Sequence, residues 1–170
     1  MIRRVRLALV ILVAVVLETT LLAHFDVLDG VPGLCLVCVL AVAYEDGPES
    51  GALFGFAMGL VLDLFLITPI GLSALSFALT GYAVGVFQAG IVRATPWLYP
   101  VLGGLGGLFG GLVFIAVGGI VGQDQLLSVH GVQVVLVSAV WDALLAPLVF
   151  PVVRHVARRP DHAGSWRIRR

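Results

Sequence analysis

The sequence predicts an all-α membrane protein, a single domain built as a bundle of six transmembrane helices. Of its 170 residues, 60% are hydrophobic and 12% are charged, whereas soluble domains are about 45–50% apolar and about 25% charged. So small a chain cannot bury so large an apolar fraction, and the excess must therefore face lipid. The apolar residues also form long continuous runs, which predict helices rather than the alternating strands of a barrel.

The predicted spans follow from these runs, because a spanning helix needs roughly 20 mostly apolar residues. The first run is basic and then apolar, like a signal peptide, but no small-residue cleavage site follows it, so we interpret it as a retained span. The second is short. Pro48 opens the third, since its missing N–H is not needed in a first helical turn, and a turn with Pro69 and Gly71 leads into the fourth. The six spans are about 5–23, 31–44, 50–67, 72–88, 98–122 and 129–153, and residues 154–170 form a basic tail.

Arginine placement predicts the orientation. All ten basic residues are arginines; three lie within the first six residues, six lie after residue 153, and Arg93 lies between. Because cytoplasmic loops are enriched in Arg and Lys, both termini and the Arg93 loop are assigned to the cytoplasmic side. The acidic turn at residues 45–49 falls on that side too, but acids contribute little to this rule. Beside apolar spans, the terminal arginines are topology signals, and no nucleic-acid partner is expected.

Glycines recur every four residues in the third span. Gly51, Gly55 and Gly59 form one stripe of a helix, and Asp63 continues it. The fifth span has a similar glycine pattern. Small residues at this spacing let another backbone come close. The stripe therefore packs within the chain's own bundle or receives a helix from another protein.

Three acids lie within the predicted spans: Glu18, Asp63 and Asp142. A charge at the bilayer centre costs about 2.5–3.5 kcal/mol, so such residues usually have a role. Apart from Arg93, no Lys or Arg lies between residues 6 and 154. The acids are therefore protonated, hydrogen-bonded, close to a histidine, or paired with a cation on a partner, and Glu18 and Asp63 are near enough to span ends to reach water. The neighbouring polar residues are Thr19, Thr20, Thr68, Ser73, His24 and His130.

No pattern in the sequence indicates catalysis, a cofactor or a metal. Cys35 and Cys38 are spaced C-x-x-C, but a structural zinc site needs four ligands and no second pair exists. A redox pair would belong to a soluble βαβ unit rather than to a span. We therefore expect buried, apolar cysteines, and no catalytic residue, cofactor or metal site.

Two segments resemble the rod shape-determining protein MreD family. They are Gly51-Ala-Leu-Phe-Gly-Phe-Ala-Met-Gly-Leu-Val-Leu-Asp63 and Pro69-Ile-Gly71-Leu-Ser-Ala-Leu75. The remaining resemblance is general: a polar residue before a threonine pair late in the first span, an apolar segment with two prolines at 144–151, and a basic tail. Asp142 departs from the pattern, since relatives often carry an uncharged polar residue there.

The resemblance implies a non-enzymatic scaffold in the bacterial cytoplasmic membrane. It implies MreC as a partner within the elongation machinery (the elongasome), together with MreB, RodA and a class B penicillin-binding protein, in support of cell shape and peptidoglycan synthesis. We expect the Gly51–Gly55–Gly59–Asp63 stripe to form or support the MreC contact.

The family's fold is similar to the substrate-binding subunits of energy-coupling-factor vitamin transporters, which supplies an alternative function. A vitamin binder needs a polar and aromatic outward pocket gated by long outside loops. The outside loops predicted here are short, which favours the scaffold.

Overall fold

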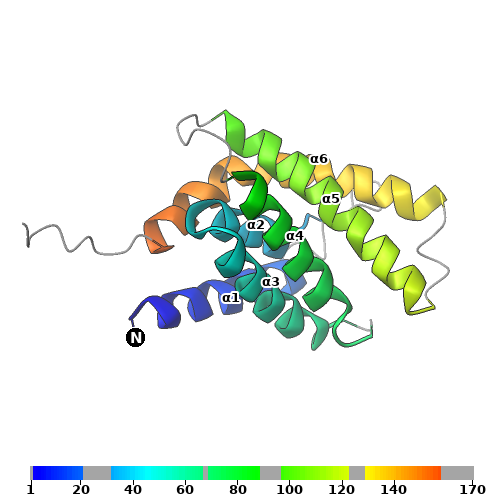
Figure 1. Ribbon diagram of the computed structural model, residues 1–170, viewed down its shortest axis with the longest axis horizontal. Coiled ribbons are helices and arrows are strands. Elements are labelled where there is room, and N and C mark those ends of the chain that lie inside the picture. Colours follow the sequence, from blue (N-terminus) through cyan, green and yellow to red (C-terminus); the bar gives the residue numbers. More distant parts are fainter. Residues whose placement is uncertain (1, 21–31, 67–68, 89–96, 123–128, 158–170) are drawn as a thin grey trace, which may run out of the picture.

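The computed structural model describes residues 2–20, 32–66, 69–88, 97–122 and 129–157 (Figure 1). Within these ranges the chain is all-helical, with six helices and no strand. The helices are α1 (Ile2–Thr20), α2 (Leu34–Asp46), α3 (Pro48–Asp63), α4 (Leu72–Gln88), α5 (Leu98–Ile120) and α6 (Val129–Ala157).

Each helix lies in or close to one of the predicted segments, with differences at the ends. α3 ends at Asp63, before the predicted limit of its span at residue 67, and α6 continues through Arg154 to Ala157, past the predicted limit at 153. A basic last turn favours this extension, because cations stabilise the negative end of a helix dipole. The predicted loops at 24–30 and 123–128, the Arg93 loop and residues 158–170 lie outside the described residues.

Among the described residues, two helices have the length and hydropathy of a membrane span. They are Leu98–Ile120 and His130–Val156, each with a mean hydropathy of 2.0, while Leu72–Gln88 is a shorter apolar helix. The 13 residues of α2 measure about 20 Å at 1.5 Å per residue, less than the roughly 30 Å of a hydrocarbon core. The count of six crossings therefore stays a prediction.

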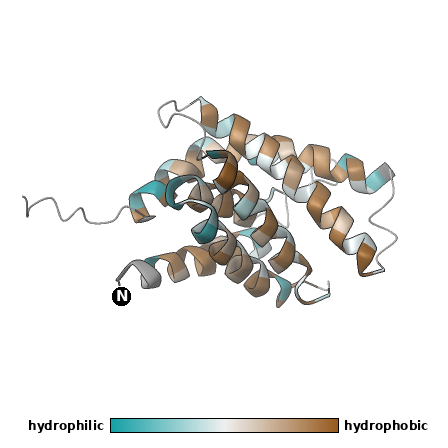
Figure 2. Cartoon of the chain, viewed as in Figure 1, coloured by the Kyte–Doolittle hydropathy of each residue, from teal (hydrophilic) through white to brown (hydrophobic). Residues whose placement is uncertain are grey.

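Helix α2 is the centre of the bundle, because it contacts each of the other five helices. Its residues 35–44 are all buried, as expected for a helix that is apolar on every side. The outer helices instead expose large apolar side chains, such as Leu53 (74% exposed), Phe87 (72%) and Ile120 (85%). Apolar residues run along the helices, and hydrophilic ones gather at the α2–α3 turn and at the ends of α6 (Figure 2). Apolar exposure on this scale is suited to lipid rather than to water.

The glycine stripe of α3 packs against α4. A Cβ built on Gly55 would meet the carbonyl oxygen of Phe77, and one built on Gly59 would lie 2.5 Å from the Cα of Ala74. Gly51 lies between α2 and α4, because a Cβ built on it would be 2.6 Å from the Cβ of Ala43 and 2.8 Å from the carbonyl oxygen of Gly81. The stripe therefore lies inside the chain's own bundle, where its missing side chains allow two backbones to touch.

Helix α5 has two glycine faces. Gly106 and Gly110 adjoin the side chains of Leu40 and Leu36 of α2, whereas Gly103 adjoins the α6 backbone. α5 can therefore pack closely against both the central helix and α6. The glycine spacing of the fifth span therefore corresponds to two separate contacts of α5, one with α2 and one with α6.

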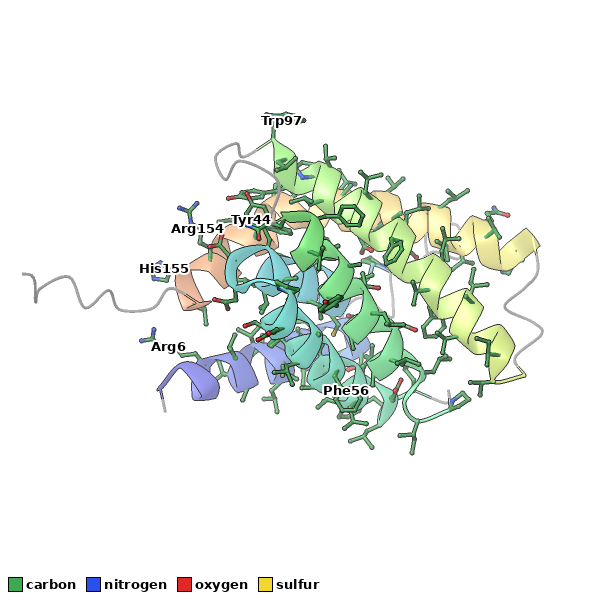
Figure 3. All side chains as sticks on the ribbon, viewed as in Figure 1. Arg6, Tyr44, Phe56, Trp97, Arg154 and His155 are labelled. Carbon is green, nitrogen blue, oxygen red and sulfur yellow. The ribbon has the colours of Figure 1, made fainter. Side chains whose placement is uncertain are left out.

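The start of α1 and the end of α6 lie at the same end of the bundle, where Arg6, Arg154 and His155 are found (Figure 3). The acidic turn between α2 and α3 lies there too, since Glu45 is 3.9 Å from the Nε of Arg154. Both side chains are partly exposed, so this ion pair contributes little stability. It does explain why an acidic turn is found beside the arginines.

Adding a methyl group at Gly55 should force α3 and α4 apart. We expect Gly55→Ala to lower the free energy of unfolding by about 1–3 kcal/mol, the usual cost of overpacking. Gly104→Ala in α5 is the matched control, because its added Cβ would come no closer than 3.3 Å, to the Cβ of Ala143. Thermal unfolding in detergent measures both, and equal melting temperatures for the two variants would contradict the packing described.

Candidate functional site

The carboxylate of Asp63 caps the start of α4. Asp63 is the last residue of α3 and is 2% exposed. Its Oδ2 accepts hydrogen bonds from the backbone N–H groups of Gly71 (2.7 Å) and Ala74 (3.3 Å), and its Oδ1 accepts one from the N–H of Ser73 (3.1 Å). The first N–H groups of a helix have no partner within it. Asp63 supplies those partners from the neighbouring helix.

The turn with Pro69 and Gly71 brings these groups together. The N–H of Leu72 bonds to the carbonyl of Pro69 at 3.2 Å, which closes a four-residue turn. Gly71 has φ +102°, and the third position of such a turn favours glycine because other residues are strained at positive φ. The turn therefore aims the N–H of Gly71 at Asp63. The structure places the two residues expected in a turn where the α4 cap needs them.

Glu18 and Asp142 together cap the start of α2. The N–H of Gly33 donates to Oδ1 of Asp142 at 2.9 Å, and the N–H of Cys35 donates to Oε2 of Glu18 at 2.6 Å. Gly33 is the N-cap residue and offers no side chain of its own. Acids from α1 and α6 therefore converge on one helix end.

The shortness of α2 explains how Asp142, in the middle of α6, reaches a helix end. Because α2 has only 13 residues, its start lies level with the middle of the longer α6. Glycines make room for the carboxylate: a Cβ on Gly107 of α5 would meet Oδ2 of Asp142, and one on Gly33 would lie 3.0 Å from Oδ1. Asp142 is consequently only 2% exposed.

Helix N-termini take the place of the cations that the spans lack. The aligned peptide dipoles put roughly half a positive charge at a helix start, where free N–H groups bind anions. Of the alternatives that the sequence leaves open, hydrogen bonding is the one observed, but its donors are backbone N–H groups rather than hydroxyls. Ser73 takes part through its N–H. The water-access alternative is wrong for Asp63, which is buried.

Sequence reasoning missed the partners of the three acids, although a signal for them exists. α2 and α4 both begin directly after a glycine, Gly33 and Gly71. Neither position holds the Ser, Thr, Asp or Asn that usually caps a helix. A helix start without its own cap, together with an acid in a neighbouring span, indicates a cap supplied across the bundle.

In the described residues the three acids of the spans cap helix starts. Among the residues described, no group of three or more His, Cys, Asp or Glu side chains is placed to hold a metal ion. Cys35 and Cys38 are buried free thiols of α2. The protein is thus of the class of all-helical membrane proteins, with apolar outer faces and acids that stabilise helix starts.

Comparison with known families identifies the group. The model of the rod shape-determining protein MreD family matches residues 1–156, so the chain belongs to this family. The family consists of membrane proteins of the MreBCD system that determine cell shape. Comparisons with curated proteins and with solved structures gave no significant match. The expected similarity to energy-coupling-factor subunits therefore stays a prediction.

Removing the Asp63 carboxylate should loosen the start of α4. We expect Asp63→Ala to lower the free energy of unfolding by about 2 kcal/mol or more, because it removes a cap and leaves buried N–H groups without acceptors. Hydrogen exchange should quicken at the N–H groups of Gly71 and Ser73. Glu49→Ala is the matched control, since Glu49 is an exposed acid on the same helix. Unchanged exchange at the start of α4 would rule out the cap.

The contributions of Glu18 and Asp142 to stability at the start of α2 should be coupled. We expect Glu18→Ala and Asp142→Ala each to cost roughly 1–3 kcal/mol, because each leaves a buried backbone N–H group at the start of α2 without its acceptor. The double variant should lose more than the sum of the two, because either acid alone still supplies one acceptor to this helix start. A double-mutant cycle from chemical or thermal unfolding measures this coupling. Simple additivity would show that the two acids act independently.

Proposed function

We propose that this protein is a non-enzymatic scaffold of the bacterial cell-wall elongation machinery. It binds MreC and, with MreB, RodA and a class B penicillin-binding protein, supports cell shape and peptidoglycan synthesis. Membership of the shape-determining family supports this role. The observation that carries it is that all three acids within the predicted spans bond to the chain's own backbone.

Intramembrane acids usually mark an ion path, a proton relay or a substrate site. Here each of the three acids joins two helices: the Gly33–Asp142 bond spans 109 residues, the Cys35–Glu18 bond spans 17, and the Gly71–Asp63 bond spans 8. Their use is therefore structural. A bundle held rigid in this way presents fixed outer faces, and fixed faces are what a partner helix needs in order to pack without a hydrophobic driving force.

The proposal includes a topology of six spans with both termini in the cytoplasm, residues 1–153 forming the membrane domain. Arg6 and Arg154 lie at one end of the bundle, as the rule for basic residues requires of cytoplasmic ends. The short α2 and α3 would then cross with help from their flanking residues. The tail, residues 154–170, would extend from the same side.

The position of the glycine stripe limits where MreC can bind on α3. Gly51, Gly55 and Gly59 all face α4, so a partner helix cannot pack directly on them. The opposite face of α3 is exposed, with Leu53 at 74% and Phe56 at 50%. The stripe is therefore proposed to support the contact by holding α3 in place, while the outward face of α3 meets MreC.

No observation among the described residues favours the vitamin-transport alternative. A vitamin site needs several convergent polar groups in a concave pocket. The hollows at the α1–α6 and α5–α6 seams are lined chiefly by aliphatic side chains. The predicted outside loops, which would gate such a site, lie outside the described residues.

Gly55→Leu should reduce the MreC that co-purifies with this protein from mild detergent. We expect roughly a tenfold loss of recovered MreC, because overpacking between α3 and α4 shifts the outward face of α3. Overpacking costs about 1–3 kcal/mol, and tenfold in affinity corresponds to about 1.4 kcal/mol. Phe56→Ala should lower recovery without lowering thermal stability, since that side chain faces outward. Ala116→Leu, on the exposed face of α5, is the control for adding bulk.

Undiminished MreC recovery with both Gly55→Leu and Phe56→Ala would refute the proposed contact. The identity of the co-purifying proteins tests the function itself. Elongation proteins are expected, whereas ATPases and a bound small molecule would indicate a transporter subunit.

A further inference from the structure

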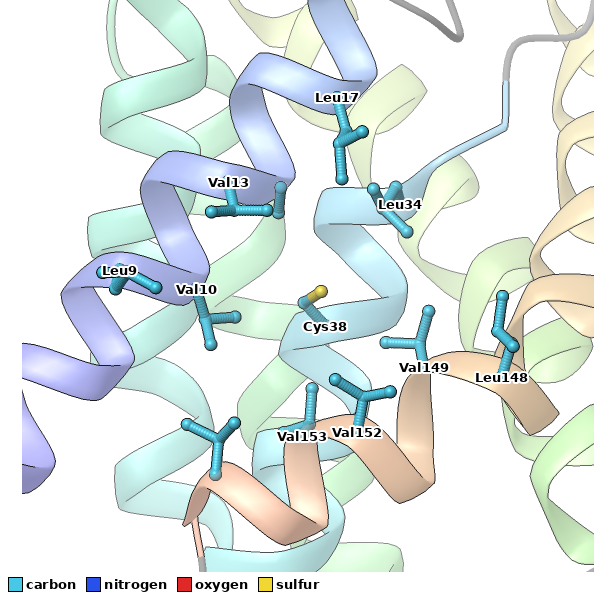
Figure 4. A pocket seen from close by; sticks show the side chains of 12 residues that line it. Leu9, Val10, Val13, Leu17, Leu34, Cys38, Leu148, Val149, Val152 and Val153 are labelled. Atoms are coloured by element: carbon cyan, nitrogen blue, oxygen red, sulfur yellow. The ribbon is translucent and has the colours of Figure 1, made fainter.

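A groove runs between α1 and α6, with α2 as its floor (Figure 4). It has a volume of about 320 Å³ and is lined by aliphatic side chains and the Cys38 thiol. Leu9, Val10 and Val13 of α1 and Val149 and Val152 of α6 approach one another across it. Such a wall offers water no hydrogen-bonding partner, so hydrocarbon is its natural filling.

The groove continues into a second hollow of about 340 Å³ at the end where the termini lie. Leu9, Val10 and Val156 line both hollows, and the second adds Arg6 and His155 (Figure 3). Within the part of the chain that the structure describes, Arg6 has no ion-pair partner, whereas Arg154 lies beside Glu45. Together the two adjoining hollows form one open groove, here called the channel, which is apolar along most of its length and basic at its mouth.

The length of the channel distinguishes its possible occupants. From Arg6 to Leu17 the α1 wall rises about 16 Å at 1.5 Å per residue, which is half of the roughly 30 Å hydrocarbon core. A partner's transmembrane helix would need the full thickness. An acyl chain needs one leaflet, with its headgroup at the basic mouth.

We propose that this channel binds an anionic phospholipid of the leaflet in which the Arg6 end lies. One acyl chain occupies the groove, and the phosphate lies at the mouth, where the Arg6 guanidinium and a ring N–H of His155 donate hydrogen bonds to its oxygens. Guanidinium matches phosphate geometry and keeps its charge in all conditions. The proposal is independent of the scaffold function.

The test uses the full chain in nanodiscs that contain equal parts of phosphatidylglycerol and phosphatidylcholine. In paired preparations, one lipid or the other carries a photoactivatable diazirine on an acyl chain, and mass spectrometry locates the labelled residues. We expect phosphatidylglycerol to label the α1 and α6 walls about fivefold more than phosphatidylcholine, the preference that one basic residue near a membrane surface provides. Arg6→Gln, an exposed change that leaves the core intact, should bring the two lipids close to equal.

Val13→Trp should fill the groove and remove the labelling of its walls by both lipids. Val132→Trp on α6 is the matched control, because Val13 and Val132 are both 45% exposed and Val132 does not line the channel. If Val13→Trp fails to fold, the labelling ratio measured with Arg6→Gln tests the proposal by itself. Equal labelling by the two lipids in the unaltered protein, an unchanged ratio after Arg6→Gln, or crosslinks at the groove to another protein's helix would each overturn the proposal. Loss of MreC binding would not affect this readout, so the two proposals fail separately.

Discussion

The first N–H groups of a helix that starts away from water need hydrogen-bond acceptors. The rest of this structure depends on which groups supply those acceptors. α2 and α4 begin after glycines that supply no capping side chain. Their acceptors are the carboxylates of Glu18, Asp63 and Asp142, which come from other helices. The acids thus accept hydrogen bonds from the N–H groups of the uncapped helix starts, and these N–H groups take the place of the missing cations. In a medium that offers no competing partner, such bonds define which helix ends can be neighbours.

Close backbone packing makes these bonds possible. α3 can lie against α4 because glycine leaves space for carbonyl groups, and Gly107 of α5 leaves space for the Asp142 carboxylate. Caps and glycine contacts together join the central α2 to α1, α5 and α6, and α3 to α4. The bundle that results has its three buried acids hydrogen-bonded inside it, with aliphatic surface outside.

Much of the fold could be predicted from residue patterns, and the errors have physical causes. Continuous apolar runs indicated the helical segments. α3 ends earlier than its apolar run because Asp63 turns to cap α4, a contact that hydropathy does not report. The three acids are unusual within apolar spans, but their donors are backbone N–H groups, which every sequence contains and which side-chain patterns therefore do not reveal. The glycine spacing predicts a packing surface, yet spacing alone does not distinguish an internal neighbour from an external one.

By itself, the sequence determined that this chain is helical, apolar on its outside, basic at its ends, and related to the MreD family through its segment at 51–75. These properties depend on composition, short-range spacing and motif, which are local. Only the tertiary structure decided which helices the glycines join, which helix starts the acids cap, and that an open groove with Arg6 at one end runs between α1 and α6. Those outcomes depend on contacts between residues as far apart as Gly33 and Asp142. Such contacts exist only once the whole chain has packed. A distant carboxylate reaches a helix start only when its own helix has the right depth in the bundle and the right rotation about its axis.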